Sequence, residues 1–448
     1  MFSKSFNLEI KNKISPFKKK IKIDSDKSIS IRSFLISSIS QNISSIKNVL
    51  ESDDVFSTIQ CLRKLGVKII KKGKGNYLVF GKGLGSLQSK KNLELNFGNS
   101  GTLARLLIGI LSTTPNIELK IKGDHSLNKR SMKKLINLMS KFGATFLPKN
   151  KYNFPLKIVS SEMPVGINYT ADVSAQLKSA VILAGLNSYG KTKICESHKS
   201  RNHTENMLRN DLKVINIKDG NTNLIEVFGK RELKKININV PADPSAAAFY
   251  TALTLLNRNS SIKMKNVCLN KTRIGFFNLL KKQGAKIKFE SLKKENNEIK
   301  GDIAVKSSNL KPINASKKYY VNSTDEYPIL FVIAALTKGI SKFYGIGDLA
   351  NKESNRIKEM QKILRQVGIK SVSTKDNIKI FGKGKFETSK KQIKVKKLGD
   401  HRICMSSFVL ASLTGANAKI NNFETVNTSS PSFLKIMKHL GANFEIQK

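Results

Sequence analysis

The chain has 448 residues, with 80 Lys or Arg against 32 Asp or Glu, so its formal net charge is +48. At about 150 residues per domain, this length predicts two or three domains. A hydrophobic share of 40% and a charged share of 25% are ordinary for folded proteins and exclude wholesale disorder. Only 10 prolines and no short period exclude the collagen-like, coiled-coil and mucin-like classes.

The basic charge has three possible explanations. A strongly basic chain favours nucleic acid or another anionic partner. Here Lys is spread along the whole chain, Ile and Asn are abundant and Trp is absent, which is typical of A/T-rich codon usage. Genome composition, a preference for anionic substrates and nucleic-acid binding all stay open. A dedicated nucleic-acid site would need a basic stripe with stacking aromatic side chains, and the sequence shows neither.

Cysteine and apolar patterns predict a cytoplasmic protein without a membrane segment. The four cysteines are far apart, so the sequence has no C-x-x-C metal or redox pair. Few thiols in a long chain favour a reducing compartment. The longest apolar runs, at 180–186 and 329–336, are too short to span a bilayer. Residues 1–20 are basic and lack the apolar stretch of a signal peptide.

One pattern recurs along the chain: an amphipathic helix, a glycine and a short strand. Five copies have their glycine at Gly66, Gly143, Gly284, Gly368 and Gly441. A weaker copy at 207–217 has Leu212 at the glycine position, and neighbouring copies are 69 to 84 residues apart. Glycine suits the residue that ends a helix with positive φ. We therefore predict one α/β unit used six times, three in each of two domains; the alternative is chance recurrence of a common α/β element.

The domain boundary is predicted near residues 240–243. PADPSAAAFYTALTLL (241–256) opens a helix with Asp243 as N-cap and Pro244 in the first turn. A second boundary near 21–26 leaves the N-terminal strand with the second domain. The sequence thus predicts an N-terminal domain at 26–240 and a C-terminal domain formed by 1–25 plus 241–448.

Several predicted helices begin with cationic or small polar residues, which suits phosphate and carboxylate groups at a helix N-terminus. The first, DKSISIRSFLI (26–36), places Ser28 and Arg32 on one helix face, with Lys27 next to Ser28 at the helix start. The second, FGNSGTLARL (97–106), lets backbone N–H groups approach a ligand and carries Arg105 in its first turns. For both segments the alternative is an ordinary capped helix with solvated charges.

Further segments of this kind follow along the chain. They are GDHSLNKR (123–130), ADVSAQLKSAVIL (171–183) with Ser174 as N-cap, RNHTE (201–205), NSTDEYPIL (322–330), NKESNRI (351–357) and DHRICMSS (400–407). Asp325 and Glu353 are the best carboxylate candidates for proton transfer. Their alternative roles are N-capping and a surface ion pair with Arg356. His203 is expected to be structural. Taken together, these segments predict two domains that point helix ends into one cleft holding a strongly anionic ligand.

These motifs, in this order, resemble the 5-enolpyruvylshikimate-3-phosphate synthase family. The matching motifs are DKSIS-x-R, FGN-x-GT, GD-x-SL-x-KR, SAQ-x-KSA, R-x-HTE-x-ML, DEYPIL, KES-x-R and DHRI-x-M, from about Ile21 to Phe433. The resemblance implies an α/β fold of two domains, an inside-out α/β barrel built from six βαβαββ units with the active site in the inter-domain cleft. It implies no metal, no organic cofactor and a monomer.

The resemblance also implies the reaction and its residues. The family transfers the enolpyruvyl group of phosphoenolpyruvate to the 5-hydroxyl of shikimate 3-phosphate, through a tetrahedral adduct, and releases phosphate. The implied shikimate 3-phosphate ligands are Lys27, Ser28, Arg32, Ser174, Ala175, Gln176, Arg201, Asp325 and Lys352. The implied phosphoenolpyruvate ligands are Lys27, Asn99, Gly101, Arg130, Gln176, Arg356 and Arg402. Lys27, Asp325 and Glu353 are the implied catalytic residues, with Asp325 deprotonating the attacking hydroxyl and Glu353 protonating the methylene carbon.

The chain departs from the family pattern at several positions. Asp24 and Ser25 replace a usual Pro-Gly, which is expected to soften the chain crossing between domains. Ser100 replaces a usual alanine and is expected to narrow the phosphoenolpyruvate pocket slightly, and Asn355 replaces an aspartate. Gly101 is the small residue whose replacement by alanine excludes glyphosate in some relatives, so we expect glyphosate sensitivity.

Besides nucleic-acid binding, two related proteins are alternatives to this interpretation. A sister enzyme that transfers enolpyruvyl to a UDP-sugar uses a loop cysteine and a Lys-Asn start. This chain has Lys27-Ser28 and no cysteine at 97–130. An inactive relative is disfavoured by the intact Lys27, Asp325 and Glu353.

Overall fold

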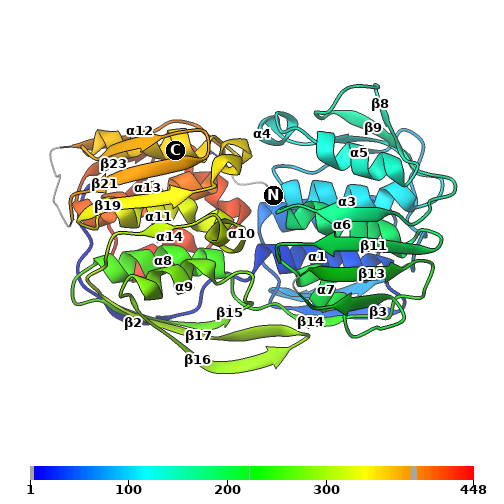
Figure 1. Cartoon of the computed structure of the whole chain (residues 1–448), viewed down its shortest axis with the longest axis horizontal. Helices are drawn as coiled ribbons and strands as arrows, with labels where there is room; N and C mark the ends of the chain where they lie inside the picture. Colours follow the sequence, from blue (N-terminus) through cyan, green and yellow to red (C-terminus); the bar gives the residue numbers. More distant parts are fainter. Residues whose placement is uncertain (1–4, 221, 385–390, 448) are drawn as a thin grey trace. The chain divides into compact units, whose positions relative to one another are not determined.

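A computed structural model describes residues 5–220, 222–384 and 391–447 (Figure 1). The two domain ranges expected from the sequence also include residues 1–4, 221, 385–390 and 448, which lie outside the described residues. The chain divides into two compact units. Unit 1 comprises Met1–Asp24, Pro241–Lys294 and Ile299–Lys448, and unit 2 comprises Ser25–Val240 and Glu295–Glu298.

Unit 2 alternates helices and short strands. Its elements are α1 (Lys27–Ile39), β3 (Ile43–Lys47), α2 (Asp53–Lys64), β4 (Ile69–Gly73), β5 (Asn76–Phe80), β6 (Glu94–Asn96), α3 (Gly101–Thr113), β7 (Glu118–Lys122), α4 (His125–Asn128), α5 (Lys133–Lys141), β8 (Thr145–Leu147), β9 (Leu156–Val159), β10 (Asn168–Ala171), α6 (Ala175–Leu186), β11 (Lys191–Glu196), α7 (His203–Leu208), β12 (Ile215–Lys218), β13 (Asn223–Phe228) and β14 (Asn237–Asn239).

Unit 1 repeats this alternation with added 3₁₀ turns. Its elements are β1 (Asn7–Ile10), β2 (Lys18–Ile21), α8 (Pro244–Leu256), β15 (Ser261–Cys268), α9 (Gly275–Lys282), β16 (Lys286–Glu295), β17 (Glu298–Lys306), β18 (Asn314–Ala315), α10 (Lys318–Ser323), η1 (Thr324–Glu326), α11 (Tyr327–Ala335), β19 (Gly339–Tyr344), η2 (Gly347–Asn351), α12 (Arg356–Gln366), β20 (Lys370–Ser373), β21 (Asn377–Gly382), β22 (Gln392–Val395), α13 (His401–Thr414), β23 (Asn417–Ile420), η3 (Phe423–Thr428), α14 (Phe433–His439) and β24 (Phe444–Gln447).

The strands of the described residues form six four-stranded sheets with one common topology. The sheets of unit 2 have the orders β14-β3-β5-β4, β6-β7-β9-β8 and β10-β11-β13-β12, and those of unit 1 have the orders β2-β15-β17-β16, β18-β19-β21-β20 and β22-β23-β1-β24. In every sheet the first two strands are parallel and the second and third are antiparallel. The predicted sixfold use of one α/β unit is confirmed.

The repeated glycine ends a helix in five of the six copies of the α/β repeat. Gly66, Gly143, Gly284, Gly368 and Gly441 all have φ between 79° and 95°, in the left-handed region that glycine adopts without steric cost. In the weaker copy, α7 already ends at Leu208, and a turn in which Lys213 N donates to Asp211 Oδ1 precedes β12. Leu212 is 74% exposed in that turn, so it does not occupy the position of the glycine in the other copies.

Each unit buries three helices in its interior. In unit 2, α1, α3 and α6 run side by side (Figure 1), and in unit 1 the helices α8, α11 and α13 pack on one another. All residues of α8, α11 and α13 are buried, which agrees with helices that are apolar or small all round rather than on one stripe. The helices that precede the repeated glycines, such as α2 and α12, have one buried and one exposed face.

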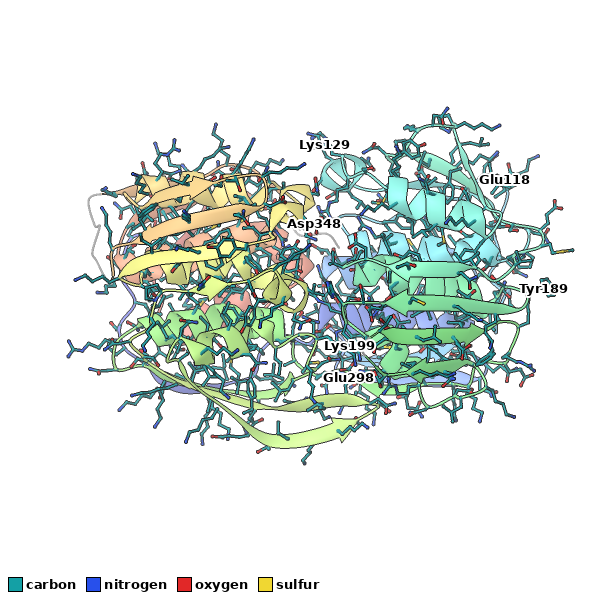
Figure 2. The ribbon with its side chains drawn as sticks, viewed as in Figure 1. Glu118, Lys129, Tyr189, Lys199, Glu298 and Asp348 are labelled. Atoms are coloured by element: carbon teal, nitrogen blue, oxygen red, sulfur yellow. The ribbon has the colours of Figure 1, made fainter. Side chains whose placement is uncertain are left out.

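Side chains that end in nitrogen project outward from both units (Figure 2). Among the described residues, no helix is both long enough and apolar enough to cross a membrane.

Candidate functional site

The first turns of α1, α3 and α6 lie close together in unit 2. Each helix is capped by a side chain: Asp26, Ser100 and Ser174 accept hydrogen bonds from Ile29 N, Leu103 N and Leu177 N. Gln176 Nε2 donates to Thr102 Oγ1 at 2.9 Å, which links the starts of α6 and α3. Helix N-termini carry partial positive charge and unpaired N–H groups, so this part of unit 2 attracts anions.

The Ser100 hydroxyl has a structural use. It is fully buried, and its Oγ accepts from Leu103 N at 3.2 Å as the N-cap of α3. Serine caps a helix far better than the alanine that is usual at this position in the family pattern.

Lys27, the first residue of α1, is held by a carboxylate. Its Nζ lies 2.9 Å from Asp54 Oδ2, and the two side chains are 16% and 5% exposed. Asp54 belongs to the first turn of α2. No sequence motif pointed to this pair, because residues 27 and 54 are brought together only by the packing of α1 on α2.

Arg32 is buried between three helices. Its Nε donates to Thr204 Oγ1 of α7 at 3.0 Å, its Nη2 to Ser179 Oγ of α6 at 3.1 Å, and its Nη1 to Ser28 O at 3.2 Å. The last contact places Ser28 and Arg32 on one helix face, as their spacing predicts. Arg201 lies two residues before α7 and is half-buried.

A second cationic group surrounds the start of α3. Arg130 Nη2 donates to Asn99 Oδ1 at 3.0 Å, and Asn99 Nδ2 donates to Asp124 Oδ2 at 2.7 Å. A Cβ atom on Gly101 would lie 2.7 Å from Arg105 Nη1 and 3.1 Å from Arg130 Nη1. Gly101 therefore lies beside two guanidinium groups, of which only Arg130 was among the expected site residues.

Unit 1 gathers carboxylates around one buried guanidinium. Arg356, whose side chain is 1% exposed, donates from Nη2 to Glu353 Oε2 at 2.6 Å, and its Nη1 lies 3.6 Å from Asp325 Oδ1. Its Nε donates to Asp400 Oδ2 at 3.0 Å. Burial alone would lower the pKa of Arg356, but Asp400, Glu353 and Asp325 outweigh it and raise that pKa. The two expected proton-transfer carboxylates thus face the same cation.

Asp400 organises this group, although no role was predicted for it from the sequence. It is fully buried, it caps α13 by accepting from Arg402 N at 3.0 Å, and its Oδ2 also accepts from Ser354 Oγ at 2.9 Å. The motif DHRI, which begins at this residue, was the available signal.

The residues of KES-x-R do not all lie on one helix. The helix α12 begins at Arg356, and Asn355 is its N-cap, accepting from Lys358 N at 3.1 Å. An Asn side chain favours this capping position. Lys352 and Glu353 therefore precede the helix, and the Glu353–Arg356 pair bridges a loop and a helix start.

Two further cations complete the unit 1 group. Lys352 Nζ donates to Asp348 Oδ2 at 2.6 Å, and Asp348, labelled in Figure 2, also accepts from Tyr320 Oη at 2.9 Å. Arg402 is 5% exposed, with its guanidinium over the ring of Phe249. The buried Nε of Arg402 has no hydrogen-bond partner within the part of the chain that the structure describes. A buried cation of this kind is costly unless an anion binds it.

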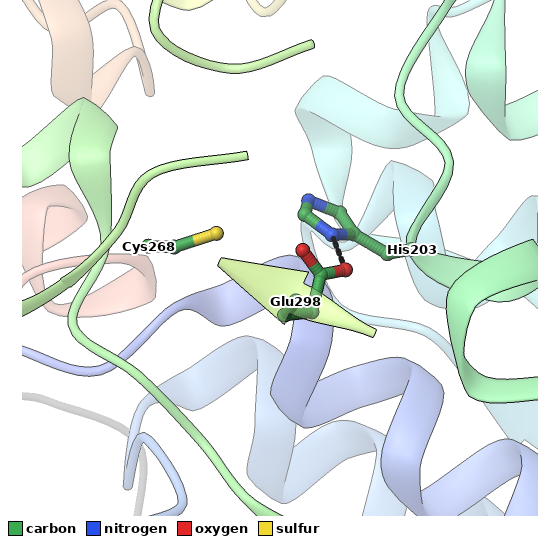
Figure 3. A group of neighbouring side chains, drawn as sticks. All are labelled: His203, Cys268 and Glu298. Carbon is green, nitrogen blue, oxygen red and sulfur yellow. Dashed lines mark hydrogen bonds and ion pairs between the residues drawn. The ribbon is translucent and has the colours of Figure 1, made fainter. Parts of the chain in front are cut away.

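His203 pairs with a buried glutamate within unit 2. Its Nδ1 lies 2.7 Å from Glu298 Oε1, and both side chains are buried (Figure 3). Asn297 Nδ2 donates to Asn206 O at 3.2 Å, so residues 295–298 pack on α7. This arrangement agrees with the structural role expected for His203.

Family comparison matches residues 11–437 to the model of "EPSP synthase (3-phosphoshikimate 1-carboxyvinyltransferase)". The chain is 36% identical to the 3-phosphoshikimate 1-carboxyvinyltransferase of Paramagnetospirillum magneticum, over 94% of both chains. It is 34% identical to the protein of that name from Bacillus subtilis, over 96% of this chain and 99% of the relative.

Solved structures give the same match. The EPSP synthase of Acinetobacter baumannii superposes with a TM-score of 0.84 at 32% identity, covering 99% of this chain and 100% of that one. The enolpyruvyl transferase NikO of Streptomyces tendae has a TM-score of 0.77 at 12% identity, covering 99% of each chain, which shows likeness of fold. The expected two-domain inside-out α/β fold is confirmed.

Proposed function

Because this chain belongs to the EPSP synthase family, we propose that the two groups of residues described above perform the family's enolpyruvyl transfer, with a distinct task in each unit. The reaction moves the enolpyruvyl group of phosphoenolpyruvate to the 5-hydroxyl of shikimate 3-phosphate and releases phosphate. It belongs to the shikimate pathway. Both substrates are anions, which matches the cations placed at the helix starts.

Unit 2 mainly binds the substrates. The shikimate 3-phosphate ligands in it are Lys27, Ser28, Arg32, Ser174, Ala175, Gln176 and Arg201. The phosphoenolpyruvate ligands in it are Lys27, Asn99, Gly101, Arg130 and Gln176. The support for this assignment is the capped starts of α1, α3 and α6, which the Gln176–Thr102 and Arg32–Ser179 hydrogen bonds hold together. Hydrogen bonds from a guanidinium to hydroxyl groups orient it before substrate arrives, which lowers the entropy cost of binding.

Unit 1 supplies the proton transfers and further anion contacts. Asp325 accepts the proton of the attacking hydroxyl, and Glu353 donates a proton to the methylene carbon, giving the tetrahedral adduct. Elimination then breaks the bond to phosphate: Glu353 takes the proton back from the methyl carbon, and Asp325 passes its proton to the departing phosphate. Arg356 and Arg402 bind phosphoenolpyruvate, while Lys352 and Asp325 contact shikimate 3-phosphate. The same groups act as acid and base in turn, as reversible proton transfer requires.

One observation carries the proposal: Glu353 and Asp325 both face the fully buried Arg356 guanidinium. A cation at this distance stabilises the ionised form of a carboxyl group, whereas a second carboxylate nearby destabilises that ionised form. The charge balance at Arg356 therefore allows one carboxyl group to hold a proton while the other gives one up.

The test is phosphate release from the purified protein, with phosphoenolpyruvate alone and with both substrates. Release should require both substrates, and Glu353→Gln should lower kcat by about 10² to 10⁴, the usual contribution of a general acid. The matched control is Glu359→Gln on α12, whose carboxylate pairs with Lys362 on the surface and should leave kcat within twofold. Full activity in Glu353→Gln would refute the assignment of Glu353.

We further propose that the protein acts as a monomer in the cytoplasm. The names of its relatives support a metabolic role, and small-molecule substrates require no second protein chain. Light scattering at micromolar concentration would check the monomer, and a dimer would refute it.

A further inference from the structure

Lys178 forms a fully buried ionic group with two carboxylates in unit 2. Its Nζ lies 2.8 Å from Glu196 Oε1, at the end of β11, and 2.7 Å from Glu205 Oε1, on α7. The three side chains are 0%, 2% and 3% exposed. Lys178 lies on α6 two residues after Gln176, so the ammonium ties the helix that carries the proposed ligands to two other segments.

Stability alone does not account for this group. Removing charges from water costs several kcal/mol per ion, and well-packed apolar residues of similar volume are often as stabilising as a buried ion pair or more so. What a buried ion group supplies beyond packing is geometry, since its partners are fixed at hydrogen-bonding distance and direction. The segments that it fixes therefore indicate its use.

The two carboxylates hold the chain on both sides of Arg201. Before it, Ser200 donates to Glu196 Oε1 from its N at 2.8 Å and from its Oγ at 2.6 Å. Lys178 Nζ also donates to Ser200 O at 3.5 Å.

After Arg201, the start of α7 is fixed to α6. Glu205 pairs with Lys178, and the neighbouring Thr204 Oγ1 donates to Ser179 Oγ at 2.8 Å. Arg201 is thus the half-buried cation between two anchored positions, Ser200 and Thr204.

We propose that the Lys178–Glu196–Glu205 group positions Arg201 relative to residues 174–176, so that both segments meet one phosphorylated substrate. The inference rests on the proposed function, in which Arg201 and residues 174–176 bind shikimate 3-phosphate. Lys178 is 0% exposed, so its ammonium acts through Arg201 and does not touch the substrate. A misplacement of about 1 Å by a residue away from the chemistry costs up to about 100-fold in catalysis.

The experiment replaces the whole group by unbranched apolar side chains, in the triple variant Lys178→Met, Glu196→Met, Glu205→Met. No charge is then left buried without its partner, so the protein should still fold, with a Tm lowered only by the two hydrogen bonds that Ser200 loses. The KM for shikimate 3-phosphate should rise by about tenfold or more, while the KM for phosphoenolpyruvate and kcat should change by less than about threefold. Amide hydrogen exchange of residues 197–202 should become faster.

A control and a reference variant make the outcome decisive. The control, Lys191→Met with Glu226→Met, removes a 3.0 Å ion pair between β11 and β13 of the same unit and should leave both KM values unchanged. The reference, Arg201→Lys, should raise the KM for shikimate 3-phosphate, because lysine lacks the bidentate guanidinium.

The results separate two failures. If Arg201→Lys raises this KM and the folded triple variant does not, the positioning role is refuted and the assignment of Arg201 stands. If neither variant raises it, the assignment of Arg201 is wrong and the positioning role is refuted with it.

Discussion

The candidate-site arginines Arg32 and Arg130 of unit 2 and Arg356 of unit 1 donate to different kinds of acceptor. In unit 2, Arg32 and Arg130 donate to neutral oxygens, namely hydroxyl, amide and backbone carbonyl groups. In unit 1, Arg356 donates to Glu353 and Asp400 and lies close to Asp325. Neutral acceptors orient a cation without cancelling its charge, whereas carboxylates orient it and offset its charge.

This contrast agrees with the different tasks proposed for the two compact units. The same α/β repeat occurs three times in each of them, and helix starts such as those of α1 and α13 are capped by a carboxylate. In the proposed function, Arg32, Arg130 and the Asp54-paired Lys27 of unit 2 bind the anionic substrates. The carboxylates around the buried Arg356 of unit 1 are proposed to exchange protons with the substrates.

Asp400→Asn should cause the largest loss in unit 1. It removes the carboxylate that holds both Arg356 Nε and the start of α13, so the free energy of unfolding should fall by about 3 kcal/mol, as expected for a broken buried pair. The ratio kcat/KM should fall by about 100-fold or more. Urea unfolding and phosphate release measure the two effects. Asp376→Asn, at an exposed turn of the same unit, is the control and should change neither.

Arg402→Met should separate binding from stability. The Arg402 guanidinium is buried, and its Nε lacks a hydrogen-bond partner in the described ranges, so an apolar side chain should leave Tm unchanged or raise it. The KM for phosphoenolpyruvate should rise by about 30-fold, because a charged hydrogen bond contributes roughly 2 kcal/mol.

Steady-state kinetics and thermal unfolding test this prediction, with Arg365→Met on the exposed face of α12 as control. A marked drop in Tm would show that Arg402 is part of the structural framework and contradict the contrast drawn for unit 1.

Gly101→Ala should weaken phosphoenolpyruvate binding in unit 2 without unfolding it. The new Cβ would meet the flexible ends of Arg105 and Arg130, which must move by a few tenths of an ångström or more. We expect the KM for phosphoenolpyruvate to rise by about tenfold and inhibition by glyphosate to weaken by at least that factor. The KM for shikimate 3-phosphate is the internal control. Unchanged inhibition would show that Gly101 does not contact the bound anion.

Asp24→Asn should give the smallest effect, a gain in stability. Burial raises the pKa of the Asp24 carboxyl, against the hydrogen bonds donated by Ser430 and Ser432 that lower it. A raised carboxyl pKa means that the folded state holds the proton more tightly, so stability is lost as the pH rises above about 4 through the folded-state pKa.

Asparagine can accept the same hydrogen bonds without a charge and should remove that loss. Tm measured from pH 4 to 8 should therefore be higher for Asp24→Asn at neutral pH and less dependent on pH. If Tm changed with pH by the same amount in both proteins, Asp24 would not be the group responsible for the pH dependence.

Much of the fold could be read from local sequence rules. The helix that begins at Pro244 after Asp243, and the helix capped by Ser174, follow directly from capping preferences. The five repeated glycines mark helix ends because few other residues adopt their φ. The sixth helix end, at Leu208, could not be recognised in this way, since no glycine marks it and a turn leads into β12.

The candidate site was predictable only in part. Motifs identified Lys27, Arg32, Asp325, Glu353 and Arg356 because these residues flank helix starts. Their partners could not be found by spacing. Asp54 reaches Lys27 through the packing of two helices, and Asp400 reaches Arg356 across 44 residues of sequence.

Interactions within a few residues produce the repeated α/β unit, the caps and the cations at the helix starts, so these features could be predicted from the sequence alone. Which charges are paired depends on how distant segments pack in the folded protein. Lys178 reads as an ordinary basic residue in the sequence, yet it is fully buried between Glu196 and Glu205. The physical reason is that burial and pairing depend on distances between segments far apart in the chain, and these distances set whether a charge binds a substrate, moves a proton or holds the backbone in place.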